Sequence, residues 1–200
     1  MYESSTVFDL IILGSGPSGL TAALYASRAF LNVLVIAGES AGGQLAITSN
    51  VENFPGFPEG VTGSELVSNM RKQAEKYGAR FIDENAKQIT GSFEENFSVQ
   101  TVSGDVYLSK SVIVATGASA KWLGIESEQK LIGKGVSACA TCDGFFFRDK
   151  VIAVVGGGDS AMEEATFLTR FASKIYVLVR KSKEELRASK IMQKKAFENP

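Results

Sequence analysis

Short apolar runs that end at glycine are the clearest pattern in the chain. The first run, Phe8 to Leu13, stops at Gly14 and predicts a buried strand. Residues 20–30 are rich in Ala and Leu and predict a helix, and the run Val33 to Ile36 predicts a second buried strand. Together these segments predict one β-α-β unit of about 30 residues.

The same pattern returns in the second half of the chain. Val151 to Val155 predicts a strand, a run of three glycines a turn, residues 160–171 a helix, and Lys174 to Val179 another strand. Two such units in tandem indicate an α/β protein with two Rossmann-like domains that bind two nucleotides. Residues 183–198 predict a charged amphipathic helix.

Capping signals mark one further helix between the two units. Residues 53–60 hold two of the four prolines and predict a loop. Thr62 and Glu65 have the spacing of a capping box, and the helix that they open is expected to end near Tyr77, with Gly78 at its C-cap.

A more β-rich stretch follows this helix. Residues 80–115 alternate between short β-rich runs and turn signals and predict a small meander. Its last run, Ser111 to Ala115, predicts a buried strand that ends at Thr116-Gly117. We therefore expect a first domain over residues 1–117 and a second over residues 118–200.

Charge and composition exclude several classes of function. The chain has 21 Lys and Arg against 22 Asp and Glu, which argues against a nucleic acid partner because such binding needs excess positive charge. It has no histidine, so Ser-His-Asp, Cys-His and HExxH sites are excluded. Two cysteines cannot close a structural zinc site alone. No membrane span or targeting segment is visible, so the cytoplasm is the expected compartment.

A glycine fingerprint opens the first β-α-β unit. Gly14, Gly16 and Gly19 form GxGxxG between a predicted strand and a predicted helix, where glycines allow a tight turn and a close approach to a pyrophosphate. Glu39, 20 residues after Gly19, is placed to accept the ribose hydroxyls. The pattern indicates FAD or NAD, and the alternative is a tight turn without a ligand.

The second unit carries a variant of this fingerprint. Gly156, Gly158 and Ala161 take the three positions, but the next strand ends in Arg180-Lys181 rather than in an acid, and Arg187 follows. Arginine can bind a 2′-phosphate that an acid would repel. The pattern therefore indicates NADP(H), and the alternative is a solvated basic patch.

The two cysteines, Cys139 and Cys142, form a CxxC motif that Asp143 follows directly. A CxxC near β-α-β units in the cytoplasm is typical of a redox disulfide. Two inert thiols, or half of a zinc site shared with a second subunit, are the alternatives. Because the chain has no histidine, Asp143 is the candidate acid and base. The run Phe145 to Phe147 is expected to pack in a core or an interface, or to shield the disulfide.

Several motifs in one order resemble the low-molecular-weight thioredoxin reductase family: GSGPSG, GGQL, VENFPGFPEG, VATGASA, GVSACATCDGFFFRDK and VVGGGDSAMEEA. The resemblance covers the whole chain, and ACATCDG between two fingerprints is highly specific. Glutathione-reductase-type enzymes carry their cysteine pair just after the second strand, where this chain has Gly42-Gly43-Gln44-Leu45.

The resemblance implies an FAD domain interrupted by an NADPH domain that holds the disulfide, with thioredoxin as the acceptor and a homodimer in the complete protein. It implies that Cys139 attacks the partner, that Cys142 faces the flavin and that Asp143 protonates the leaving thiolate. The implied FAD contacts are Gly14, Ser15, Gly16, Pro17, Ser18, Gly19, Gly38, Glu39, Gly42, Gly43, Gln44, Leu45, Asn53, Thr116 and Gly117. The implied NADPH contacts are Gly157, Gly158, Asp159, Ser160, Arg180, Lys181 and Arg187.

The chain departs from the family pattern in two respects. Val179-Arg180-Lys181 stands where the family usually has His-Arg-Arg, and the segment before Arg187 is longer. The family also continues beyond the length of this chain, so we expect the chain to be truncated at its C-terminus. A flavoprotein of the same fold with another donor or acceptor, or a truncated non-catalytic module, are the alternative functions.

Overall fold

The computed structural model describes residues 6–48 and 50–199, and the chain divides into two compact units, residues 1–119 and 120–200. The boundary expected from the sequence, after Gly117, falls close to this division. None of the helices within the described residues is long and apolar enough to cross a membrane.

A parallel four-stranded sheet lies at the centre of the first unit, in the order β4-β3-β2-β8. Neighbouring strands are in register, with Leu13 opposite both Ile36 and Val114. The loops that follow β2, β3 and β8 therefore leave the sheet at the same edge. The four strands are β2 (Leu10–Leu13), β3 (Val33–Ile36), β4 (Arg80–Ile82) and β8 (Val112–Val114).

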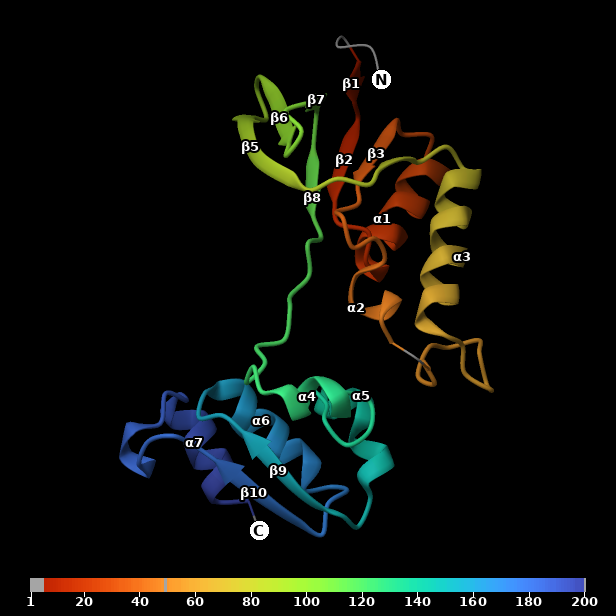
Figure 1. The fold of residues 1–200 in the computed structure, drawn as a ribbon. Coiled ribbons are helices and arrows are strands. Elements are labelled where there is room, and N and C mark those ends of the chain that lie inside the picture. The colour runs from red at the N-terminus through yellow and green to blue at the C-terminus, as the bar shows by residue number, and fades with distance from the viewer. Residues whose placement is uncertain (1–5, 49, 200) are drawn as a thin grey trace. The chain divides into compact units, whose positions relative to one another are not determined.

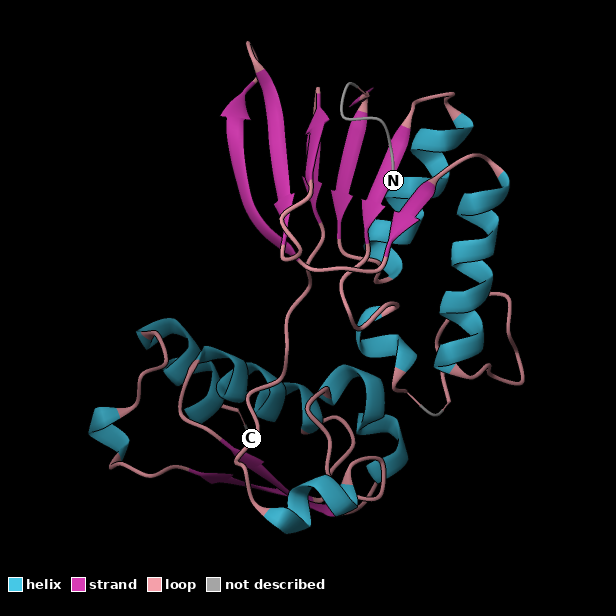
Figure 2. Ribbon diagram, turned by 45° about the horizontal axis from the view of Figure 1, so that its top comes forward, coloured by secondary structure: helices cyan, strands magenta, loops and turns pink. Residues whose placement is uncertain are grey.

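The two central strands, β2 and β3, are covered on both faces, which explains why they are apolar throughout. The expectation that β8 is buried is wrong, because Ile113 and Val114 are 39% and 65% exposed in this edge strand. Helices α1 (Pro17–Arg28) and α3 (Gly63–Lys76) lie side by side and supply Ala23 and Ala74 to the core on one face (Figures 1 and 2). Val99 of the antiparallel meander packs against the other face. The second sheet has the order β1-β7-β6-β5, formed by β1 (Val7–Phe8), β5 (Ala86–Ser92), β6 (Asn96–Thr101) and β7 (Val106–Ser109).

The predicted caps of α3 are confirmed. The Thr62 hydroxyl accepts a hydrogen bond from the backbone N–H of Glu65 at 3.3 Å. At the other end, the N–H of Gly78 donates to the Glu75 carbonyl and the N–H of Ala79 to the Ala74 carbonyl. This pair of bonds is a Schellman motif, and Gly78 takes the left-handed conformation that it requires, with φ of 100°.

Two strands of the first unit differ from the prediction. The run from Phe8 to Leu13 forms two strands rather than one, because β1 pairs with β7 of the meander while β2 joins the parallel sheet. Residues 80–82, expected in the meander, form β4 and pair with β3 instead. In both places the choice of partner strand, which lies far away in sequence, decides the outcome.

The second unit contains two parallel strands in register, β9 (Val151–Val155) and β10 (Lys174–Leu178). Helix α6 (Asp159–Leu168) connects them and buries Ala165 and Leu168 against Val154. The unit also holds α4 (Glu126–Leu131), α5 (Ala140–Asp143), the 3₁₀ helix η1 (Gly144–Phe147) and the 3₁₀ helix η2 (Lys183–Glu185). Its last helix is α7 (Lys190–Phe197).

The prediction of one helix over residues 183–198 is wrong. The structure has η2, then a non-helical segment, and α7 starts only after its N-cap, Ser189. The helix is interrupted because the N–H groups of Arg187 and Ala188 both donate to the carbonyl of Gly157, at 2.9 and 3.0 Å. These bonds to the glycine loop after β9 replace the bonds within a continuous helix.

Candidate nucleotide-binding loops and redox disulfide

The first fingerprint forms a tight turn between β2 and α1 in which two of the glycines leave no room for a side chain. Gly14 has φ of 104°, and a Cβ there would lie 2.3 Å from the Ala115 carbonyl oxygen. A Cβ on Gly19 would lie 2.0 Å from the Gly14 carbonyl oxygen. The two glycines therefore permit close packing of the turn against α1 and against the segment that follows β8.

Gly16 has a different role, since a Cβ on it would meet nothing within 4 Å. It is the N-cap of α1, and Pro17 occupies the first turn of that helix. The missing side chain leaves open space at a helix N-terminus, where backbone N–H groups and the helix dipole favour a phosphate. This combination fits the pyrophosphate of a dinucleotide.

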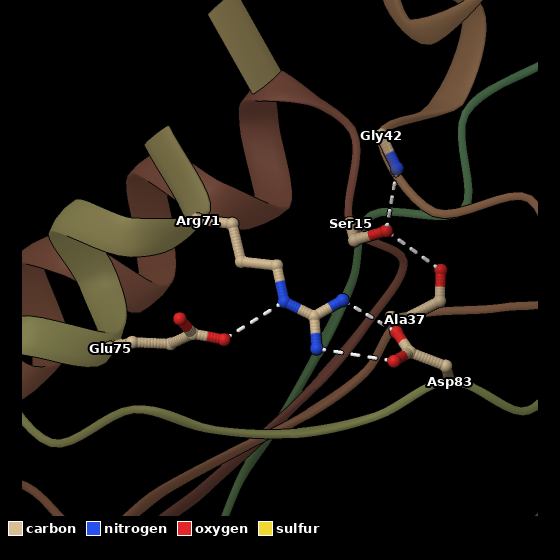
Figure 3. A network of polar contacts seen from close by, with 6 residues as sticks. All are labelled: Ser15, Ala37, Gly42, Arg71, Glu75 and Asp83. Carbon is tan, nitrogen blue, oxygen red and sulfur yellow. Dashed lines mark hydrogen bonds and ion pairs between the residues drawn. The ribbon is translucent and has the colours of Figure 1, made fainter. Parts of the chain in front are cut away.

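Ser15 ties the fingerprint turn to the loop after β3 (Figure 3). Its side chain is 3% exposed, and its hydroxyl donates to the Ala37 carbonyl at 2.9 Å and accepts from the Gly42 N–H at 3.0 Å. The hydroxyl is thus engaged within the protein. We assign the Ser15 side chain to holding the two loops together rather than to direct contact with a ligand.

The loop after β3 carries the predicted ribose-binding acid. The N–H of Gly38 donates to the Glu84 carbonyl at 2.9 Å, and the N–H of Glu39 donates to the side chain of Asn85 at 3.3 Å. The Glu39 side chain is exposed. Because β2 and β3 are adjacent and parallel, this acid and the fingerprint turn lie at the same edge of the sheet.

An ion-pair network braces the segment that follows β4 (Figure 3). Arg71 of α3 binds Asp83 at 2.6 Å and Glu75 at 2.9 Å. Hydrogen bonding to Asp83 raises the pKa of the Arg71 guanidinium. Asp83 immediately precedes Glu84 and Asn85, so the network supports the backbone on which the Glu39 loop rests.

The structure brings most of the other predicted contacts of the first unit to the same edge. A Cβ on Gly43 would lie 3.3 Å from the Gly16 Cα, and one on Gly14 would lie 3.2 Å from the Thr116 Cα. Asn53 instead lies exposed in the loop between Val51 and Val61, and its side chain makes no hydrogen bond to another described residue. Ser18, Gln44 and Gly117 are exposed, and Leu45 packs beside the Val51 cluster.

The second fingerprint joins β9 to α6. Gly156 has φ of 147°, and a Cβ on it would lie 3.0 Å from the Ala161 Cβ, so alanine at the third position still allows close packing. Gly158 is the N-cap of α6, and a Cβ on it would meet open space. Asp159 and Ser160 are exposed in the first turn of α6.

The basic residues predicted to bind a 2′-phosphate follow β10. Arg180 is exposed, and its side chain has no hydrogen bond or ion pair with another described residue. Lys181 pairs with Glu185 at 3.3 Å, and the Ser182 hydroxyl lies 3.4 Å from the same carboxylate. The Arg187 side chain is also exposed and has no such partner among the described residues. Two of the three cations are therefore available to a ligand.

Cys139 and Cys142 form a disulfide, with their Cα atoms 5.3 Å apart. The motif forms the short helix α5, which follows Cys139 and continues into η1. Ala140 packs against Ala165 and Leu168 of α6, and a Cβ on Gly144 would lie 3.0 Å from a Leu168 methyl group. The disulfide segment is therefore docked on the helix of the second fingerprint.

Asp143 and the phenylalanines lie next to the disulfide. Asp143 is half-buried, and its side chain makes no hydrogen bond with another described residue. Phe145 and Phe146 are 63% and 56% exposed, so the expectation that they belong to a core is wrong, whereas an interface remains a prediction. Their rings contact each other, and the Arg148 guanidinium lies 5.6 Å from the Phe145 ring centroid.

Glu164 was not identified from the sequence. It lies on α6, on the same helix face as Ala161 and Leu168, toward the disulfide segment. Burial raises the pKa of the Glu164 carboxyl, and a hydrogen bond from the Ala140 backbone opposes this effect in part. The sequence did contain a signal for Glu164, since the helical period places this acid on the apolar face of the predicted helix.

Comparison with known proteins identifies the family of this chain. The pyridine nucleotide-disulphide oxidoreductase family matches residues 8–199. The chain therefore belongs to this family.

Individual relatives agree with this assignment. A thioredoxin reductase of Streptomyces coelicolor is 52% identical over 197 residues, which are 98% of this chain and 60% of that protein. One of Mycolicibacterium smegmatis is 52% identical over 201 residues, or 100% of this chain and 63% of that protein. The chain thus spans about three-fifths of the length of the curated relatives it matches.

Solved structures show the same similarity. The crystal structure of thioredoxin reductase from Streptococcus pyogenes is 44% identical, covers 98% of this chain and 62% of that chain, and has a TM-score of 0.84. Thioredoxin reductase from Giardia duodenalis is 39% identical, covers 97% of this chain and 62% of that chain, and has a TM-score of 0.88.

Proposed function

We propose that this protein is a thioredoxin-disulfide reductase that uses FAD and NADPH. The observation that carries the proposal is the Cys139–Cys142 disulfide, which is docked on α6, the helix that opens the second nucleotide fingerprint. The relatives named above support thioredoxin as the acceptor, because each is called a thioredoxin reductase.

The two fingerprints fit the two nucleotides. The open space at Gly16 and the acid Glu39 suit FAD, since a carboxylate accepts ribose hydroxyls. The open space at Gly158 and the exposed cations Arg180 and Arg187 suit NADPH, since guanidinium groups bind a phosphate well. When bound, these nucleotides supply the hydride and the electron transfer that reduce the disulfide.

Reduction of the Cys139–Cys142 bond takes up two electrons and two protons and yields two thiols. As a thiolate, Cys139 then attacks the disulfide of thioredoxin, which forms a bond between Cys139 and the partner and releases one partner thiolate. The Cys142 thiolate next attacks the Cys139 sulfur, which restores the disulfide and releases the second partner thiolate. Asp143, with its uncommitted carboxyl, accepts a proton from the attacking thiol and donates one to the leaving thiolate.

A protein acceptor is supported by the surface beside the disulfide. Exposed aromatic rings are enriched where proteins bind one another, and Phe145 and Phe146 present two of them within a few residues of Cys142. Arg148 adds a positive charge next to this apolar surface. We include Phe145, Phe146 and Arg148 in the proposed docking surface for thioredoxin.

Two further properties belong to the proposal. The cytoplasm is the proposed compartment, because a reversible dithiol needs a reducing environment. A homodimer is the proposed assembly, and the exposed aromatic side chains of Tyr25 and Phe30, 69% and 96% exposed, offer apolar surface for it.

The test is NADPH oxidation by the FAD-loaded protein in the presence of oxidised thioredoxin, followed by a count of thioredoxin thiols. The unchanged protein is expected to produce two thiols for each NADPH consumed. Cys139→Ser and Cys142→Ser are expected to abolish this turnover, while Ala138→Ser, which adds a hydroxyl beside Cys139, is expected to keep it. Turnover that survives either cysteine substitution would refute the proposal.

A further inference from the structure

Asp159 stands at a junction between the second fingerprint and the segment that carries Arg187. Its carboxylate accepts a hydrogen bond from the Ser189 N–H at 2.6 Å. Two residues earlier, the Gly157 carbonyl accepts from the N–H groups of Arg187 and Ala188. Three hydrogen bonds thus fix residues 187–189 against the loop that precedes α6.

Packing reinforces this junction. Ala188 is 5% exposed, and a Cβ on Gly157 would lie 3.0 Å from a Leu186 methyl group and 3.3 Å from one of Val179. The backbone on both sides of Arg187 is therefore held in place, whereas the Arg187 side chain itself is exposed. The fixed backbone therefore restricts the positions that the Arg187 side chain can reach.

The negative charge of Asp159 does not suit a direct contact with a phosphate. A carboxylate in the first turn of a helix is favourable for the helix, but it repels a phosphate bound at the same N-terminus. Its bond to the Ser189 N–H directs the carboxylate into the protein's own backbone. The Asp159 carboxylate therefore has a partner within the protein, two residues after Arg187.

We propose that Asp159 is a specificity-determining positioning residue, which holds Arg187 where it can bind the 2′-phosphate of the nucleotide. This inference rests on the proposed use of NADPH. It assigns Asp159 a role toward Arg187 rather than toward the cofactor itself. The residue is therefore expected to affect ligands with a 2′-phosphate and to spare those without one.

The experiment compares 2′,5′-ADP, which carries the 2′-phosphate, with 5′-ADP, which lacks it, by isothermal titration calorimetry. Asp159→Ala is expected to lower the affinity for 2′,5′-ADP by about tenfold, the effect of one lost hydrogen bond of ordinary strength. The affinity for 5′-ADP is expected to stay nearly unchanged. Asp159→Asn, which keeps an oxygen acceptor for the Ser189 N–H, is expected to retain most of the affinity. Glu126→Ala, which removes another first-turn acid in the same unit, is the matched control.

A double-mutant cycle tests whether Asp159 acts through Arg187. If it does, Asp159→Ala combined with Arg187→Ala binds 2′,5′-ADP no more weakly than Arg187→Ala alone. Tighter binding of 2′,5′-ADP by Asp159→Ala would mean that the carboxylate merely repels the phosphate, and equal weakening of both ligands would mean a general structural role. Either result overturns the inference.

The outcome also separates this inference from the proposed function. If the unchanged protein binds 2′,5′-ADP no better than 5′-ADP, the proposed use of NADPH fails, and the inference fails with it. If the unchanged protein discriminates and Asp159→Ala discriminates equally well, only the inference fails. Circular dichroism and thermal unfolding of each variant establish that the compared proteins are folded.

Discussion

The Ser15 hydroxyl lies 3.0 Å from the Gly42 backbone nitrogen, and this hydrogen bond connects the glycine turn after β2 with the loop after β3. Asp159 makes the corresponding connection in the second unit, through the Ser189 N–H. In each unit a side chain of the fingerprint therefore binds the backbone near the predicted ribose or phosphate contact, rather than pointing freely to a ligand. Each fingerprint turn and its second recognition segment form one structural piece.

Ser15→Ala is expected to destabilise the contact between the glycine turn after β2 and the loop after β3. It leaves the Gly42 N–H and the Ala37 carbonyl without their side-chain partner, which costs about 1–3 kcal/mol in the free energy of unfolding. The affinity for FAD is expected to fall by roughly tenfold. Chemical denaturation and titration of flavin fluorescence measure the two effects. Ser68→Ala, which removes an exposed serine hydroxyl from α3, is the control, and equal effects of the two substitutions would contradict the role of Ser15.

Asp143→Asn is expected to slow thioredoxin reduction and leave the fold intact. A general acid–base group typically contributes about 10²–10⁴-fold, and we expect a loss of kcat in that range. Asp149→Asn is the matched control, because it removes the same charge at an exposed position with φ of 59°, which asparagine tolerates. A loss of less than about threefold, well below the usual acid–base contribution, would leave Asp143 without a catalytic role.

The third prediction concerns the pH dependence of stability. Burial raises the pKa of Glu164 above its ordinary value of 4.5, so the folded protein holds a proton that the unfolded chain has already released. The free energy of unfolding therefore falls as the pH rises from about 4.5 through the raised pKa. Glu164→Gln is expected to lack this fall and to gain stability relative to the unchanged protein across that window.

Urea denaturation at a series of pH values measures the effect. Glutamine keeps an oxygen acceptor for the Ala140 N–H, so the comparison isolates the titration of the carboxyl. Glu59→Gln, at an exposed position in the first unit, controls for the loss of a negative charge, because Glu163 itself helps to raise the pKa of Glu164. A difference between Glu164→Gln and the unchanged protein that stays constant with pH would contradict the prediction.

Arg180→Ala is expected to raise the KM for NADPH by roughly 10- to 100-fold, the effect of one lost charge-assisted hydrogen bond, and to leave the KM for NADH nearly unchanged. Lys181→Ala is expected to have a smaller effect, because Lys181 is already paired with Glu185. Steady-state kinetics with both nucleotides measure the difference. Equal kcat/KM for NADPH and NADH in the unchanged protein would contradict the assignment of this site.

Local signals in the sequence predicted much of the fold. The runs Val33–Ile36 and Val151–Val155 form strands with the expected bounds, since a short continuous apolar run has a clear pattern, although Val151 and Val155 are exposed. Helix α1 starts at Pro17 rather than at the expected residue 20, because proline suits the first turn of a helix although it is rare inside one. The caps of α3 were predicted because they depend on side chains a few residues apart.

Features that depend on distant contacts were not predicted. The helix expected over residues 183–198 is interrupted because the Gly157 carbonyl takes the N–H groups of Arg187 and Ala188. The roles of the Ser15 and Asp159 side chains also depend on partners 27 and 30 residues away in sequence. No local pattern specifies such partners. The disulfide was predicted, since the CxxC spacing allows the bond between Cys139 and Cys142 that the structure contains, whereas its redox role stays a prediction.

The most direct test of the account is whether electrons from NADPH reach the Cys139–Cys142 disulfide. The FAD-loaded protein is titrated with NADPH without oxygen, free thiols are alkylated with iodoacetamide, and the labelled cysteines are identified by mass spectrometry. We expect Cys139 and Cys142 to be unlabelled before NADPH is added and both to be labelled after two equivalents, because the flavin and the disulfide each accept two electrons. A flavin that is reduced while both cysteines stay unlabelled would contradict the account.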